Sequence, residues 1–215
     1  MTEVVIKALR HGRLPWRSAL LAMLALALWW AWGAAPEALV WDRAALARGE
    51  LWRLLTGHWV HSDGGHALWD IAALILLGFL FEPRLKGRLP GVLLAGSLGV
   101  DAWLWWAPDA PVLYCGLSGI LNSLLAAGLV AWWREQPHVL IPLTGLGMLA
   151  KSLMELQAGS MLLTSTAWPG VPQAHLAGMA AGLVYTALLY RDARGCHETD
   201  PPPSLSAVPR PGRPG

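Results

Sequence analysis

Charged side chains are scarce in this sequence of 215 residues, since Asp, Glu, Lys and Arg together make up only 14%. An average soluble domain carries about 25%, so the chain has too few charges to cover the surface of a water-soluble domain of this length. Hydrophobic residues account for 55% of the chain, and the mean hydropathy is +0.43. These figures exclude disorder of the chain as a whole, because disordered chains are poor in apolar residues. The composition instead predicts a polytopic membrane protein.

Cysteine, phenylalanine and excess charge of one sign are also nearly missing. The two cysteines, Cys115 and Cys196, do not make a disulfide framework. The formal net charge of +2 gives no electrostatic footprint for nucleic acid. The basic N-terminal stretch is followed by further apolar runs without a small-residue cleavage site, so no cleavable signal peptide is expected. What is abundant is tryptophan, with 14 residues.

Six apolar runs approach the length of about 17–25 residues that a membrane span needs. They cover residues 18–35, 66–81, 89–107, 114–133, 138–156 and 173–190. Each must be helical in lipid, because its backbone groups have no water to bond. The predicted fold is an all-α membrane protein, a bundle of six transmembrane helices. It divides the chain into an N-terminal segment (1–17), a membrane domain (18–192) and a disordered Pro-rich tail (193–215).

Lys and Arg in the short connections predict the orientation of the spans. The basic segments before span one, between spans two and three, after span four and after span six all fall on one side. Both termini are therefore predicted to be cytoplasmic, and the long loop 36–65 faces outward. Most tryptophans lie near the outer span ends or in this loop, as an aromatic belt would.

Ser118 is the first candidate for chemistry, because it lies between Gly116 and Gly119 at the outer end of span four. A serine there can be a nucleophile, with the glycines leaving room for another backbone. The same residues also suit a small-residue packing face between helices. Both interpretations remain open from this segment alone.

His175 favours the nucleophile, because it lies at the outer end of span six, at similar depth to Ser118. Gly178 and Gly182 follow it at i+3 and i+7, so all three share one helix face that allows close helix packing. If span four is the neighbour, His175 can accept the serine proton as a general base. No acidic residue follows in a position that orients His175, so a dyad is expected rather than a triad.

Three histidines, His58, His61 and His66, gather before span two. Their spacings match no metal-binding signature, and no metal is expected. His66 is instead a candidate hydrogen-bond donor to a developing oxyanion.

Four segments resemble the motifs of the rhomboid intramembrane serine proteases, in that family's order over about residues 50–190. They are the Trp-Arg loop segment Glu50-Leu-Trp-Arg-Leu-Leu-Thr56, the loop histidines His61 and His66, the nucleophile motif Gly116-Leu-Ser-Gly119, and Ala174-His-Leu-Ala-Gly178 with Gly182. The resemblance implies a six-span protease without a cofactor, in which Ser118 attacks a peptide bond and His175 is its base. It also implies an oxyanion site formed by the Ser118 backbone N–H and the His66 side chain.

Two positions depart from the family pattern. Asp70 stands where the family usually has an asparagine, and an ionised carboxylate would repel an oxyanion. Asp70 would need to be protonated, or to orient His66 instead. Asn122 stands where most rhomboids have an aromatic residue, and it is a candidate replacement donor.

With these departures and its short length, the chain resembles the rhombosortase branch of the family more than the general rhomboids. By that resemblance, the substrates are membrane-anchored bacterial proteins ending in a Gly-rich segment, one span and a basic end. The enzyme would lie in the inner membrane with its site open to the periplasm, and its partners would be these substrates and the lipid bilayer, not nucleic acid. A general rhomboid protease acting on other single-span substrates is the alternative.

Asp101, Lys151 and Glu155 lie within predicted spans and are unexplained by a dyad. Lys151 and Glu155 are i, i+4, so they are expected to pair. The three charges also leave open a small proton-coupled transporter, and a non-catalytic rhomboid-like binder is a third class. Residues 157–172 form an uncharged, turn-rich loop that could cover the site as a lid or serve as a static connector.

Overall fold

The computed structural model describes residues 15–162 and 164–198, and its long helices coincide with the six predicted spans. These helices are α2 (Trp16–Trp32), α5 (Gly64–Leu85), α6 (Leu89–Trp106), α7 (Ser118–Glu135), α8 (Leu140–Ala158) and α9 (Pro172–Glu198). α9 continues six residues beyond the predicted end of the membrane domain at 192. The rest of the predicted tail, 199–215, and most of the N-terminal segment lie outside the described residues.

The loop 33–63 contains short elements that the hydrophobic pattern does not predict. They are β1 (Trp41–Asp42), α3 (Arg43–Ala47) and α4 (Arg53–Thr56), and β1 pairs antiparallel with β2 (Leu113–Tyr114) just before α7. The fold is therefore mostly but not entirely helical. Arg53 is buried and holds this loop together, since it pairs with Glu50 at 2.7 Å and donates to the backbone carbonyl of Val40 at 2.9 Å.

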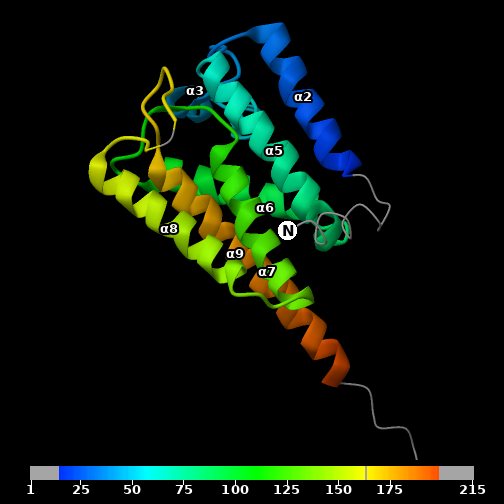
Figure 1. Ribbon diagram of the computed structural model, residues 1–215. Coiled ribbons are helices and arrows are strands. Elements are labelled where there is room, and N and C mark those ends of the chain that lie inside the picture. The colour runs from blue at the N-terminus through cyan, green and yellow to red at the C-terminus, as the bar shows by residue number, and fades with distance from the viewer. Residues whose placement is uncertain (1–14, 163, 199–215) are drawn as a thin grey trace, which may run out of the picture.

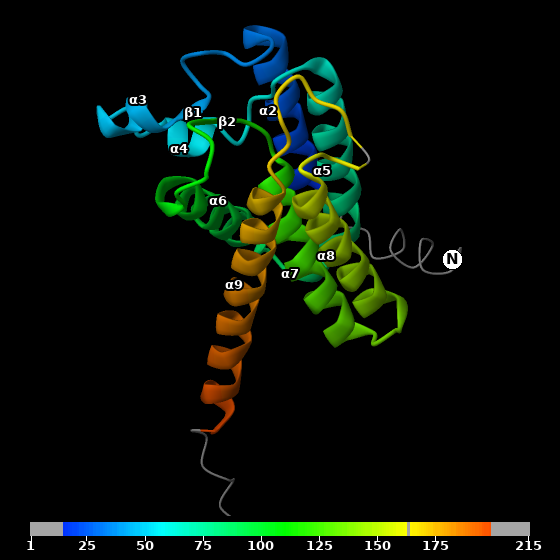
Figure 2. The same cartoon turned by 90° about the vertical axis from the view of Figure 1, so that its left-hand side faces the viewer.

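Helix α7 is the central element of the bundle, and it packs against α5, α6, α8 and α9. Figure 1 shows α2 alongside α5 at one edge and α8 at the other. Figure 2 shows α3, α4 and the two strands gathered at the same end of the bundle as the loop between α8 and α9. That end also holds the first turns of α5, α7 and α9.

Helix α2 is attached to α5 by polar contacts inside the bundle. The buried Glu82 carboxylate accepts hydrogen bonds from the Ser18 hydroxyl at 2.7 Å and from its backbone N–H at 2.8 Å. Gly78, one turn earlier on α5, leaves the space that Ser18 occupies. Burying a carboxylate without hydrogen-bond donors is costly, and Ser18 supplies two donors to Glu82.

The outer surface of the bundle is apolar, whereas many buried residues are polar. Large side chains such as Trp30 (90% exposed), Trp106 (77%) and Leu68 (69%) face outward, while His58, His61 and Glu155 are fully buried. By length and hydropathy, α5 is the one helix among the described residues that qualifies as a membrane span, and α2 is a shorter apolar helix. An apolar exterior around a polar interior is what a lipid environment favours.

Candidate active site

Ser118 is the first residue of α7. Gly116, two residues earlier, has a backbone conformation that only glycine adopts easily. Gly116 has φ +118°, and a Cβ there would lie 2.5 Å from His66 Nε2. The turn is fixed by the Gly116 N–H, which donates to the Gly57 carbonyl at 3.1 Å, and by the Leu117 N–H, which donates to Asp70 Oδ2 at 2.7 Å. As the first helical residue, Ser118 has a backbone N–H without an acceptor inside the helix.

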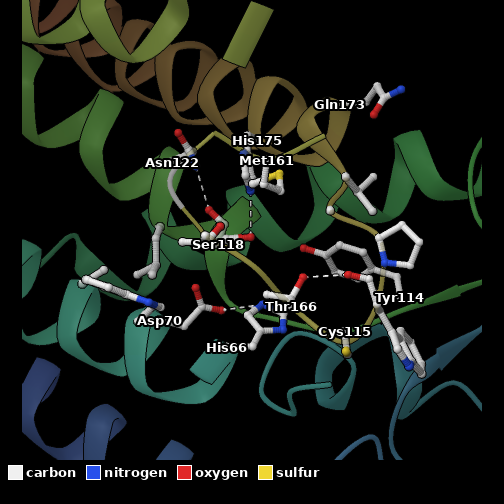
Figure 3. Close-up of a pocket in the computed structure, with 18 of the residues that line it drawn as sticks. His66, Asp70, Tyr114, Cys115, Ser118, Asn122, Met161, Thr166, Gln173 and His175 are labelled. Atoms are coloured by element: carbon white, nitrogen blue, oxygen red, sulfur yellow. Dashed lines mark hydrogen bonds and ion pairs between the residues drawn. The ribbon is translucent and has the colours of Figure 1, made fainter. Parts of the chain in front are cut away.

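The structure brings Ser118 and His175 together, with His175 Nε2 2.9 Å from Ser118 Oγ (Figure 3). Close packing of α7 against α9 makes this possible. A Cβ at Gly178 would overlap the carbonyl oxygen of Gly119, and one at Gly182 would overlap that of Ser123. The glycine face of span six therefore does lie against span four, as its spacing predicts.

His66 and Asp70 lie next to Ser118, one turn apart on α5. His66 Nε2 and His61 Nε2 are each 3.3 Å from Asp70 Oδ2, and His66 Nδ1 is 3.0 Å from the Ser62 hydroxyl. Both ring nitrogens of His66 thus face acceptors. Asp70 accepts from Leu117 and faces both histidines, which fits the expectation that it orients His66.

Asn122 and His58 have partners of their own. The Asn122 side-chain N–H donates to the backbone carbonyl of Ser118 at 2.9 Å, so in this structure the amide bonds within the helix. His58 Nε2 lies 3.1 Å from Asp101 Oδ1, in a buried pair that links the loop 33–63 to α6. Within residues 15–162 and 164–198, no group of three or more His, Cys, Asp or Glu is arranged to hold a metal ion.

A cavity of about 950 Å³ opens beside Ser118 and His175. Its walls include Leu76 on α5 and Thr144 and Met148 on α8, so it extends down between these two helices. Its roof comes from the loop between α8 and α9, including Thr166 and Trp168. The cavity is therefore bounded by α5, by α8 and by the loop between α8 and α9.

Asp63 ties that loop to the start of α5. Its Oδ1 caps α5 by accepting the His66 N–H at 2.9 Å, and its Oδ2 accepts the Ala167 N–H at 2.7 Å across the mouth of the site. Burial opposes ionisation of Asp63, but the hydrogen bonds from Ala167, His66 and Ser62 outweigh it and lower the pKa of Asp63 to about 2. The loop is thus anchored by an ionised carboxylate.

The remaining charges in the predicted spans, Asp101, Lys151 and Glu155, also have partners. Lys151 Nζ donates to Glu155 Oε1 at 2.7 Å, which confirms the predicted i, i+4 pair. With Asp101 on His58, none of the three charges needs a transport role to explain its position. The sequence analysis does not predict that Glu155 lies close to His175. In the structure, Glu155 Oε2 is 4.0 Å from His175 Nδ1. A signal for this contact was present in the sequence, because Glu155 and His175 both lie near helix ends that are predicted to face outward.

Comparison with known proteins identifies the family. The model of the Rhomboid domain matches residues 48–192, which is more than half of the chain and includes every residue of the site described above. Among curated proteins, none matches the chain.

Proposed function

The chain belongs to the rhomboid family of membrane-embedded intramembrane serine proteases, and we propose that it is an active peptidase using Ser118 and His175. The contact of 2.9 Å between Ser118 Oγ and His175 Nε2 is the observation that carries this proposal. A serine hydroxyl at hydrogen-bond distance from an imidazole is the arrangement that nucleophilic acyl transfer requires. Retention of both residues disfavours a non-catalytic binder.

In the proposed reaction, Ser118 Oγ attacks the carbonyl carbon of the scissile peptide as its proton moves to His175 Nε2. When the C–N bond breaks, the same proton is given to the departing amine. The acyl group then remains on Ser118 until water removes it. The mouth of the cavity beneath the loop between α8 and α9 supplies a route for that water.

The negative charge on the attacked oxygen needs donors that are already in place. The Ser118 backbone N–H at the start of α7 and the His66 side chain are the proposed donors. Support for His66 comes from its place in the cavity wall, next to Gly116, and from the Ser62 hydroxyl, which lies 3.0 Å from Nδ1 and holds the ring. The Nε2–H is the proposed donor, and it must turn to the oxyanion from Asp70 Oδ2, which lies 3.3 Å away in this structure. Asn122 is proposed as an additional donor to the oxyanion, because it lies one turn after Ser118 on α7.

The substrates we propose are secreted bacterial proteins with a Gly-rich C-terminal segment followed by a membrane anchor. A scissile peptide must leave its helix to be attacked, and glycine unwinds at the lowest cost. The proposal places six spans in the inner membrane, with the site open to the periplasm.

Co-expression with a tail-anchored protein of this type tests the proposal. We expect release of the protein from the membrane by the wild type and none by Ser118→Ala or His175→Ala. Release by Ser118→Ala at the wild-type rate would overturn the serine mechanism. The mass of the new C-terminus identifies the acceptor, since water leaves a free carboxylate and a membrane amine adds its own mass.

A further inference from the structure

A carboxylate lies on the far side of the His175 ring from Ser118. Glu155 Oε2 is 4.0 Å from Nδ1, while Nε2 is 2.9 Å from Ser118 Oγ. The Glu155 side chain is fully buried and that of His175 is 8% exposed. The three residues come from three helices, α8, α9 and α7, and follow one another in the order carboxylate, imidazole, hydroxyl.

The two oxygens of Glu155 have different surroundings. Oε1 accepts from Lys151 Nζ at 2.7 Å and from the Leu162 N–H at 2.9 Å. Oε2 is buried without a hydrogen-bond partner among the described residues. A buried carboxylate oxygen without a donor is unfavourable, and the His175 ring nitrogen is placed to supply one. Catalytic hydrogen bonds are often long in the free enzyme and shorten when substrate binds.

This placement matters because His175 can accept the serine proton only at an unprotonated Nε2. The neutral ring must then carry its proton on Nδ1, and a carboxylate beside Nδ1 selects that tautomer. As Oγ bonds to the substrate carbon, the serine proton moves to Nε2, while the Nδ1 proton stays and Glu155 remains ionised. The Nε2 proton leaves with the amine when the C–N bond breaks, so the ring returns to its starting tautomer.

We propose that Glu155 is a positioning residue for His175, which makes the site a Ser118–His175–Glu155 unit rather than a dyad. The inference rests on the proposed peptidase activity. Lys151 contributes by holding Oε1, which leaves Oε2 turned toward the ring. The titratable groups around His175 are Lys151 and Glu155 on α8 and His66 and Asp70 on α5.

The test compares Glu155→Gln with Glu155→Asp in purified enzyme. Glutamine keeps the volume and an acceptor oxygen for Leu162 and Lys151, but its NH₂ group against Nδ1 favours the wrong tautomer. Aspartate keeps the charge with a shorter reach. We expect the kcat of Glu155→Gln to fall between about tenfold and 10⁴-fold with KM unchanged, and Glu155→Asp to retain more activity than Glu155→Gln.

The rate at which a fluorophosphonate probe labels Ser118 gives a readout independent of the protein substrate, and we expect the same order. A merely structural role predicts the reverse, because glutamine preserves packing and the loop contact better than aspartate does. Labelling by Glu155→Gln at or above the Glu155→Asp rate therefore overturns the inference.

Glu82→Gln is the matched control, since Glu82 is another buried carboxylate but bonds Ser18 on α2, away from the site. Its folded fraction should label at the wild-type rate. If Glu155→Gln does not fold, Lys151→Met and Lys151→Met/Glu155→Gln are compared, because the double variant leaves no unpaired charge. A slower double variant supports the inference, and equal rates contradict it. An unlabelled, inactive wild type would instead reject the proposed function.

Discussion

Asp70 is the residue whose role changes most when its contacts are considered. Its Oδ2 accepts the Leu117 N–H at 2.7 Å and lies 3.3 Å from Nε2 of both His61 and His66. It therefore fixes the peptide just before the nucleophile and the ring proposed to bind the oxyanion. A carboxylate in this position orients donors without itself donating to the substrate.

Replacing Asp70 with alanine should lower both stability and cleavage. The Leu117 N–H and two histidines would lose a buried acceptor, at a cost of about 1–3 kcal/mol, and His66 would lose its orientation. We expect a lower melting temperature in detergent and a lower kcat. Asn122→Ala, measured alongside, reports on Asn122 as the proposed additional oxyanion donor, whose loss would reduce kcat by about 10²-fold or more. Wild-type cleavage by both variants would contradict any oxyanion role for the two side chains.

Single residues also mark where prediction from sequence ends. The spacing of His175, Gly178 and Gly182 places them on one helix face, and the structure packs that face on α7. The sequence predicts Glu155 only as the partner of Lys151, because a contact between helices depends on how α8 is rotated against α9. The helical periodicity of a single segment gives no information about how two helices are rotated relative to each other.

At the level of elements, long helices follow from apolar runs and short ones do not. All six long helices lie where such runs occur. The strands β1 and β2 are two residues each, so no alternating pattern can develop, and their pairing joins segments about 70 residues apart. Trp41 and Tyr114, one from each strand, lie in one buried cluster with side chains of α6, so tertiary packing and not local propensity fixes the strands.

The loop between α8 and α9 is an element with a defined anchor, Asp63, and its docking should depend on pH. The folded pKa of about 2 lies below the ordinary value of 3.8. The anchor is therefore fully effective above about pH 4 and is lost as the pH falls through 2. We expect pepsin to cut the loop increasingly between pH 4 and pH 2.

Asp63→Asn is the control for this experiment. Its side-chain oxygen can still cap α5, but its NH₂ group cannot accept from Ala167, and it does not titrate. The loop of this variant should be cut readily at every pH in the range. A wild type whose cutting changes with pH no more than that of Asp63→Asn would show that Asp63 does not hold the loop.

For the molecule as a whole, polarity is arranged opposite to that of a soluble protein. The carboxylates predicted to lie inside spans, Asp70, Asp101 and Glu155, are buried in the bundle and each has a partner, while tryptophan and leucine side chains cover the outside. Composition predicts this class of protein, because the class follows from the total fractions of charged and hydrophobic residues. The cavity between α5 and α8 cannot be predicted from composition, since it depends on how the helices are arranged around α7.

The proposed six-span topology makes a prediction about the two ends of the bundle. The loop between α8 and α9 should face the periplasm, and the connection between α7 and α8 should face the cytoplasm, because it follows Arg134. Ser165 and Gln136 are exposed positions in these two segments. In a Cys115→Ala/Cys196→Ser background, an impermeant maleimide should label Ser165→Cys in intact spheroplasts but Gln136→Cys only after permeabilisation. Labelling of both from one side would contradict the topology, because helix α8 connects the two positions and must then not cross the membrane.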